Sequence, residues 1–98
     1  MSISEAQRRH LKKLAHHLKP VVIVGNAGLS KNVLTEIDIA LEHHELIKVR
    51  INAGDKNERH NLIDEICKKT SAKQVVSIGH VAGFYRQAEK IKIILPKD

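Results

Sequence analysis

The chain has 98 residues, of which 42% are hydrophobic and 29% charged, and its formal net charge is +6. This composition is typical of one soluble globular domain over residues 1–98 and excludes a disordered chain. No apolar run approaches the roughly 20 residues that span a bilayer, and the charged N-terminal segment is not typical of a secretory signal. Cys67, the single cysteine, cannot form an internal disulfide. We therefore expect a cytoplasmic monomer with no membrane partner.

The first predicted element is a basic helix. It begins at Ser4, which forms a capping box with Gln7, and it ends at Lys19, because Pro20 disfavours helical backbone in the residue before it. Its buried stripe consists of four apolar residues at helical spacing, Leu11, Leu14, Ala15 and Leu18. The basic residues of this segment are Arg8, Arg9, Lys12, Lys13 and Lys19.

A short strand and a second helix follow. Residues 21–24 are rich in β-branched valine, which predicts a strand buried on both faces. Ser30 is a candidate N-cap for a helix that runs to His44 with an apolar inner face and an acidic outer face. The acidic face consists of Glu36, Asp38 and Glu42. Residues 46–51 then alternate at period two, which predicts a half-buried strand with Lys48 and Arg50 on its polar side.

The second half of the chain predicts one more helix and two more strands. Asp55 and Glu58 form a second candidate capping box at the start of the third helix. Residues 74–78 form the third strand, and Gly79 and Gly83 indicate a bulge or bend in its extension. Residues 91–95 form the last strand. The order α-β-α-β-α-β-β predicts an α/β two-layer sandwich with a four-stranded mixed sheet.

The four-residue glycine loop Gly25, Asn26, Ala27 and Gly28 lies between the first strand and the second helix. Its two glycines allow a phosphate chain to approach the backbone closely, and the helix start supplies N–H donors and partial positive charge. Lys31 opposes the helix dipole at this point, which favours a bound phosphate. The alternative is a tight turn that needs positive φ at Gly25 or Gly28. The spacing matches neither a Walker A motif nor a dinucleotide fingerprint, which disfavours a nucleotide-dependent enzyme.

The basic first helix is the second candidate site. Arg8/Lys12 and Arg9/Lys13 are like charges at i,i+4, and each pair costs a helix roughly 0.2–0.5 kcal/mol. They favour a surface that meets phosphates, and solvated surface charge is the alternative explanation.

Other chemistry has little support in the sequence. Tyr85, beside Arg86, could stack one base, whereas we expect Phe84 to pack in the core. The neighbouring histidines do not share a metal-binding face. No nucleophile with a base and an acid can be singled out. We therefore expect no catalytic residue, no metal and no cofactor.

Four segments carry a resemblance to a known family. They are Leu-Lys-Pro at 18–20, Val-Gly-Asn-Ala-Gly-Leu at 24–29, Leu-Glu-His-His-Glu-Leu-Ile-Lys-Val at 41–49 and Tyr-Arg at 85–86. The chain resembles the CRM (chloroplast RNA splicing and ribosome maturation) domain in its small stand-alone bacterial form, the YhbY-type protein. Position 26 is Asn where the family often has a basic residue, which leaves more of the phosphate binding to Lys31 and the first helix.

The resemblance implies a fold similar to the C-terminal domain of bacterial translation initiation factor three. It also implies RNA binding, with the glycine loop likened to the G-x-x-G loop of KH domains. For the stand-alone bacterial members it implies association with precursors of the large ribosomal subunit.

Two functions are therefore in view. The first is a non-catalytic RNA-binding protein that binds ribosomal RNA in a pre-ribosomal particle. Its candidate residues are Gly25, Asn26, Ala27, Gly28, Lys31, Arg8, Arg9, Lys12, Lys13, Lys19, Tyr85 and Arg86. The second is an adaptor that docks on a ribosomal protein or assembly factor through the acidic face of the second helix.

Overall fold

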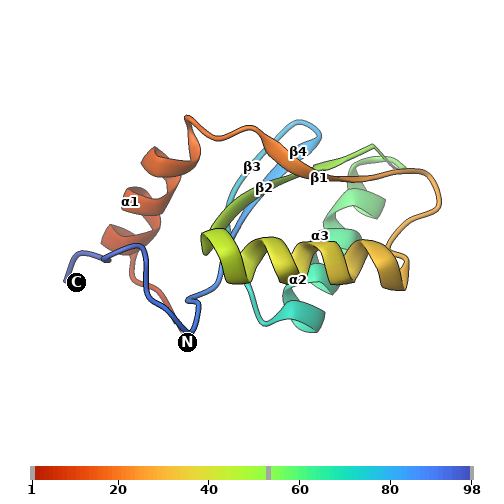
Figure 1. Ribbon diagram of the computed structural model, residues 1–98. Helices are drawn as coiled ribbons and strands as arrows, with labels where there is room; N and C mark the ends of the chain where they lie inside the picture. Colours follow the sequence, from red (N-terminus) through yellow and green to blue (C-terminus); the bar gives the residue numbers. More distant parts are fainter. Residues whose placement is uncertain (1, 53, 98) are drawn as a thin grey trace.

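Three helices and four strands alternate along the chain in a computed structural model that describes residues 2–52 and 54–97. The elements are α1 (Glu5–Ala15), β1 (Pro20–Val24), α2 (Lys31–His44), β2 (Leu46–Ile51), α3 (Lys56–Thr70), β3 (Lys73–Ile78) and β4 (Val81–Tyr85). Figure 1 shows α1 at one end of the molecule, with α2 and α3 against the sheet. The predicted α/β class and element order are confirmed.

The sheet is mixed and has the strand order β1-β2-β4-β3. β1 is parallel to β2, and β4 is antiparallel to both β2 and β3. The parallel pair follows from the helix α2 that connects its strands. β3 and β4 form a hairpin whose turn includes Gly79, with φ +59°.

The last predicted strand is wrong. Residues 91–95 do not join the sheet, and the fourth strand is instead Val81–Tyr85, inserted between β2 and β3. The turn at Gly79 reverses the chain, so that residues 81–85 form a strand of their own and not an extension of β3. Residues 86–97 continue as irregular chain, and Ile93 and Leu95 pack against the apolar side of α1.

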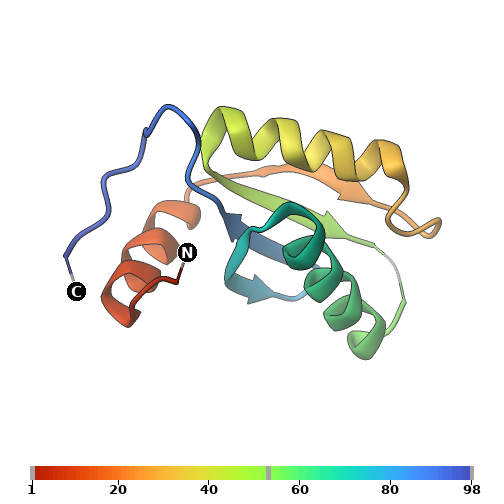
Figure 2. The same cartoon turned by 90° about the horizontal axis from the view of Figure 1, so that it is seen from below.

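Both faces of the sheet carry helices, so the predicted two-layer arrangement needs a correction. Ile47, Val49 and Ile51 of β2 belong to the larger core, which α2 and α3 cover. Leu46, on the opposite face of the same strand, packs with Leu11 of α1. Figure 2 shows α1 beside one end of the sheet, away from α2 and α3. α1 covers only one end of its face because it has just 11 residues.

α1 is shorter than predicted. Its capping box at Ser4 and Gln7 is present, but the helix ends at Ala15 and not at Lys19. Leu11 and Ala15 are completely buried, whereas Leu14 and Leu18 are 39% and 38% exposed. The predicted four-residue stripe is therefore a two-residue contact, because the chain has already left the helix before Leu18.

β1 is buried on one face only. Val22 and Val24 lie in the larger core, whereas Val21 and Ile23 are 53% and 61% exposed. The expectation of burial on both faces is wrong, because β1 is an edge strand and α1 does not extend over this part of the sheet.

The irregularity predicted in the extension after Gly79 lies instead in β3, the strand that pairs with Gly83. The register of β3 against β4 shifts between Gln74 and Val76, where Gly83 pairs with Val76. A Cβ on Gly83 would lie 2.6 Å from Val76 Cγ1. Glycine is therefore required by the close approach of the two strands.

Candidate nucleic-acid interface

The glycine loop is a tight turn with unused backbone donors. The Gly28 amide donates to the Gly25 carbonyl at 3.0 Å, and the Ser30 amide donates to the Gly28 carbonyl at 3.1 Å. Ser30 then caps α2 by accepting from the Val33 amide at 3.2 Å. Asn26 and Ala27 are exposed, and their amides have no backbone acceptor among the described residues. These amides are available to an anionic ligand.

The backbone conformation explains why one of the two loop positions is glycine, but not the other. Gly28 has φ +80°, which other residues adopt only with strain. Gly25 has no such φ, and an added Cβ would meet no atom within 4 Å. The tight-turn explanation therefore accounts for Gly28 alone. Nothing in the folding of the chain calls for glycine at position 25.

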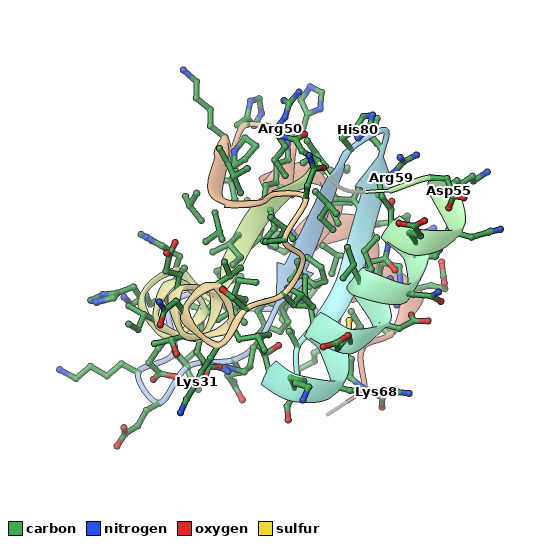
Figure 3. The ribbon with its side chains drawn as sticks, turned by 90° about the vertical axis from the view of Figure 1, so that its right-hand side faces the viewer. Lys31, Arg50, Asp55, Arg59, Lys68 and His80 are labelled. Carbon is green, nitrogen blue, oxygen red and sulfur yellow. The ribbon has the colours of Figure 1, made fainter. Side chains whose placement is uncertain are left out.

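Several basic side chains share the loop's end of the molecule. Lys31 is the first residue of α2 and is exposed. Figure 3 shows Arg50, His80 and Arg59 near one another at this end, away from Lys31. A hollow of about 360 Å³ lies beside them, and its basic lining residues are Lys56, Arg59, His60 and His80.

Arg50 and His80 lie at the same edge of the sheet because β2 and β3 run in the same direction, so that their carboxyl ends meet there. Sequence analysis did not include them among the site residues. The alternation of β2 already placed Arg50 on the polar side, but no local pattern pairs His80 with Arg59.

The cations of α1 lie at the other end of the molecule. Figure 1 places α1 and the β1–α2 loop at opposite ends, and the longest dimension of the fold is 39 Å. Arg9, Lys12, Lys13 and Lys19 are exposed there. Lys12 and Lys13 occupy the last turn of α1, where the helix dipole favours cations. Solvated charge that stabilises α1 therefore remains a sufficient explanation for these two residues.

A partly uncovered face of the sheet lies between these two ends. We define the open sheet face as the part of the α1 side that α1 leaves uncovered. Its residues are Ile23, Lys48, Arg50, Val76, Ile78 and Val81. Along β2, Leu46 lies beneath α1, Lys48 follows, and Arg50 is nearest the loop's end. The described ion pairs all involve Arg86, so these two cations have no described carboxylate partner.

Three of the predicted site residues, Arg8, Tyr85 and Arg86, make contacts within the protein. The Arg8 guanidinium donates to the Gln74 carbonyl of β3 and so attaches α1 to the sheet. Tyr85 is only 1% exposed and packs with Leu11 and Leu46, so the prediction that it stacks on a base is wrong for this conformation. Burial raises the pKa of its hydroxyl. The predicted core position of Phe84 is confirmed.

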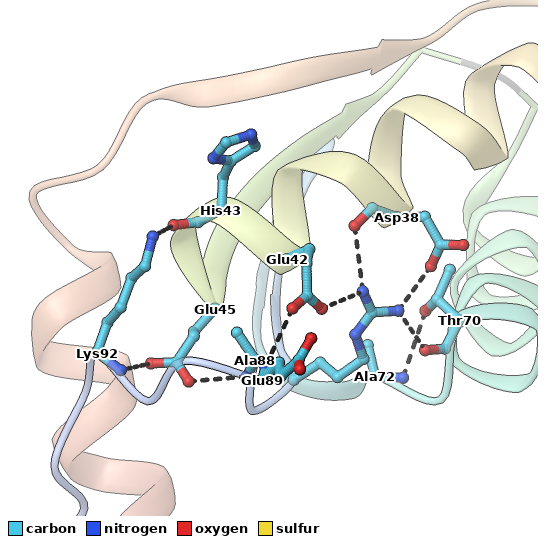
Figure 4. A network of polar contacts seen from close by, with 10 residues as sticks. Asp38, Glu42, His43, Glu45, Thr70, Ala72, Ala88, Glu89 and Lys92 are labelled. Carbon is cyan, nitrogen blue, oxygen red and sulfur yellow. Dashed lines mark hydrogen bonds and ion pairs between the residues drawn. The ribbon is translucent and has the colours of Figure 1, made fainter.

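Arg86 is held by the acidic face of α2. Its guanidinium lies 2.6 Å from Asp38 Oδ1 and 3.5 Å from Glu42 Oε1, and it donates to the Thr70 carbonyl at 2.9 Å (Figure 4). These contacts give Arg86 a role within the fold, so its presence after β4 does not require an interaction with RNA. They also neutralise part of the acidic face that the adaptor hypothesis needs, and Glu36 is its remaining exposed carboxylate without a described ion pair.

Other kinds of site find no support in the described residues. No three His, Cys, Asp or Glu side chains among them form a group that could hold a metal ion. None of the described helices has the length and apolar character needed to cross a bilayer.

The fold and the site define a small α/β domain with a glycine loop at a strand-to-helix junction and a basic, partly open sheet face. The sequence profile of the CRS1/YhbY (CRM) domain matches residues 3–86. The chain therefore belongs to the CRM domain family, as its sequence motifs indicated.

Similar proteins cover the chain almost completely. An "RNA-binding protein" of Haemophilus influenzae is 47% identical over 96 residues, which are 98% of this chain and 97% of that protein. A "Probable RNA-binding protein" of Pseudomonas aeruginosa is 41% identical, over 92% of this chain and 86% of that protein. The solution structure of a Staphylococcus aureus protein, described as a candidate RNA-binding protein, has a TM-score of 0.85 and 31% identity. It covers 97% of this chain and 100% of its own.

Proposed function

We propose that this protein binds RNA without catalysing a reaction, and that its RNA is ribosomal RNA in precursors of the large ribosomal subunit. The observation that carries the RNA-binding proposal is the empty space around Gly25. A Cβ at this position would meet no atom within 4 Å, yet the residue is a glycine. A phosphate backbone held against the loop amides supplies the missing reason for glycine. The names of the relatives support RNA as the ligand, and the family resemblance motivates the large subunit.

The charges of the site favour a long polyanion over a single phosphate group. Lys31 and Arg50 lie at the loop's end, Lys48 on the open sheet face, and Lys12 on α1. If about five phosphates of a single strand are neutralised, log K falls with log salt at a slope of roughly −3 to −4. An affinity for RNA that does not change with salt would contradict this electrostatic contribution.

Substitution of Gly25 tests the loop. We expect Gly25→Val to change the free energy of unfolding by less than about 0.5 kcal/mol, because the space is empty. It should weaken RNA binding about tenfold, because the side chain blocks the approach of the backbone to the amides. Gly28→Ala is the comparison for stability. The alanine must adopt the left-handed conformation of Gly28, which should lower the free energy of unfolding by about 1 kcal/mol or more. Wild-type affinity in folded Gly25→Val would show that the loop is not the site.

Crosslinking in cells, followed by sequencing of the bound RNA, tests the identity of the ligand. The expected result is enrichment of large-subunit ribosomal RNA and its precursors, with a loss of crosslinks in Gly25→Val. Crosslinks confined to messenger RNA or the small subunit would retain RNA binding and reject the large-subunit part of the proposal.

A further inference from the structure

A hollow of about 370 Å³ lies where α1 meets the open sheet face. Three of its lining residues are the aliphatic side chains of Val76, Ile78 and Val81, from the hairpin β3–β4. The remaining lining residues are Lys12, His16, Pro20 and Lys48. The hollow therefore combines apolar side chains with two lysines from different elements.

The apolar part of this hollow is partly open to solvent. Ile78 is 70% exposed, and its neighbours Val76 and Val81 in the hollow are half-buried. A surface that only attracts phosphates through cations needs no apolar side chains, and contiguous exposed apolar groups usually mark a binding site. No acidic residue lines the hollow, so its charge is complementary to an anion with an apolar part.

We propose that the hollow receives an unpaired base of an RNA strand, with Lys12 and Lys48 binding the adjacent phosphates. This inference rests on the proposed function and narrows its substrate class to single-stranded RNA. Unpaired bases can leave the stack and contact a protein surface, whereas the bases of an A-form duplex stay stacked in grooves that side chains enter poorly. A base offers the flat apolar surface that Val76, Ile78 and Val81 can contact.

The position of the hollow fits this assignment. It lies between the α1 cations and Arg50, so a strand that leaves the glycine loop can cross the open sheet face and reach it. Lys48 is half-buried between the hollow and the sheet, and it has no described ion-pair partner. A lysine placed in this way retains its charge for a phosphate.

The experiment compares three fluorescent probes of equal length. They are a 12-nucleotide single-stranded RNA, the same sequence as a duplex, and an abasic ribose-phosphate 12-mer. We expect the wild-type protein to bind the intact single strand most tightly. Ile78→Ser should weaken that binding about fivefold, the effect of about 1 kcal/mol of lost apolar contact, and leave the affinities for the duplex and the abasic strand unchanged.

Two further variants act as controls. Ile39→Ser removes an isoleucine of similar exposure, 56%, from α2 on the other side of the sheet, and it should change no affinity. Lys48→Gln should weaken the binding of every probe and reduce the magnitude of the salt slope for single strands by about 0.7. Ile78→Ala is the milder substitution for use if thermal unfolding shows that serine disturbs the hairpin.

Equal binding of abasic and intact strands by the wild type, or unchanged binding in Ile78→Ser, would overturn the base-binding proposal while RNA binding itself stands. Displacement of the RNA by an acidic 12-residue peptide, whose binding Ile78→Ser abolishes, would assign the hollow to a protein partner instead. No binding of any RNA probe by the wild type would reject the proposed function together with this inference.

Discussion

At the scale of single residues, Glu45 shows how a surface-type side chain becomes part of the interior. It is completely buried at the junction of α2 and β2, with φ +63°. Its carboxylate accepts backbone N–H groups from Ala88 and Lys92, each at 2.8 Å (Figure 4). It also accepts the Ile93 N–H at 2.6 Å. Glu45 therefore anchors the chain that follows β4 to the end of α2.

Stability should depend on the charge of this carboxylate. Burial acts to raise the pKa of Glu45, but the three backbone donors and Lys92 outweigh it, so the pKa lies below its ordinary value. A group with a lowered folded-state pKa stabilises the fold above its ordinary pKa, and the contribution disappears as the pH falls through the folded-state value.

We expect Glu45→Gln to reduce the free energy of unfolding at pH 7 by about 2–3 kcal/mol, because charge-assisted hydrogen bonds are lost or weakened. Urea unfolding of both proteins from pH 7 to pH 3 measures this loss, and the difference should shrink toward the acid end. Glu36→Gln, on the exposed face of α2, serves as the control and should lie within about 0.5 kcal/mol of the wild type. A Glu45→Gln protein as stable as the wild type at pH 7 would contradict the anchoring role.

Residue types alone predicted some of these positions and misassigned others. Ser4, Ser30 and Asp55 each cap a helix as predicted, because a cap depends on residues three positions apart. The role of Tyr85 depends on Leu11 and Leu46, which are far away in sequence. Its place beside Arg86 suggested that it could stack on a base, and only the packing of α1 shows that it is buried.

At the scale of elements, the hairpin β3–β4 depends on Gly83. An alanine in mid-strand usually stabilises a protein relative to glycine by roughly 0.5–1 kcal/mol. Here the added Cβ would lie 2.6 Å from the branched side chain of Val76, and the bulge in β3 fixes that neighbour in place. We therefore expect the opposite sign, a loss of about 1–3 kcal/mol in Gly83→Ala, measured by thermal or urea unfolding.

Gly25→Ala provides the matched comparison, since no atom lies within 4 Å of its added Cβ. A Gly83→Ala protein at least as stable as Gly25→Ala would show that the hairpin relaxes freely and that the close approach is unimportant.

The elements that periodicity describes were predicted best. α2 and β2 have the predicted residues, because regular apolar spacing and a clear cap define them. The last strand was misplaced because residues 81–85 and 91–95 are both short apolar runs. The Glu45 carboxylate binds the amides of Lys92 and Ile93, so these residues do not pair with a strand. Residues 81–85 pair with both β2 and β3.

At the scale of the whole molecule, the glycine loop and α1 lie at opposite ends of a fold 39 Å long, joined by the open sheet face. One RNA strand that contacts both ends has to be long enough to cross this distance. With a rise of roughly 3.4 Å per nucleotide along a stacked strand, that length is about ten to twelve nucleotides.

We expect the affinity for single-stranded RNA to increase with length up to about this size and then to level off. Fluorescence titration of strands from four to twenty nucleotides at constant salt measures the dependence. Lys12→Gln should lower the affinity for long strands and leave tetranucleotides that bind at the loop unaffected. A plateau at four nucleotides would confine the interface to one end of the molecule.

The sequence by itself determined the α/β class, the element order, the glycine loop, the helix caps and the family, because these depend on local spacing and on short motifs. The tertiary structure decided which basic side chains lie near one another. It separates α1 from the loop, adds Lys48, Arg50, Arg59 and His80, and commits Arg8 and Arg86 to contacts within the protein. The physical reason is that strand direction and pairing order bring together residues that no local pattern connects, and that burial and ion pairing remove others from the surface.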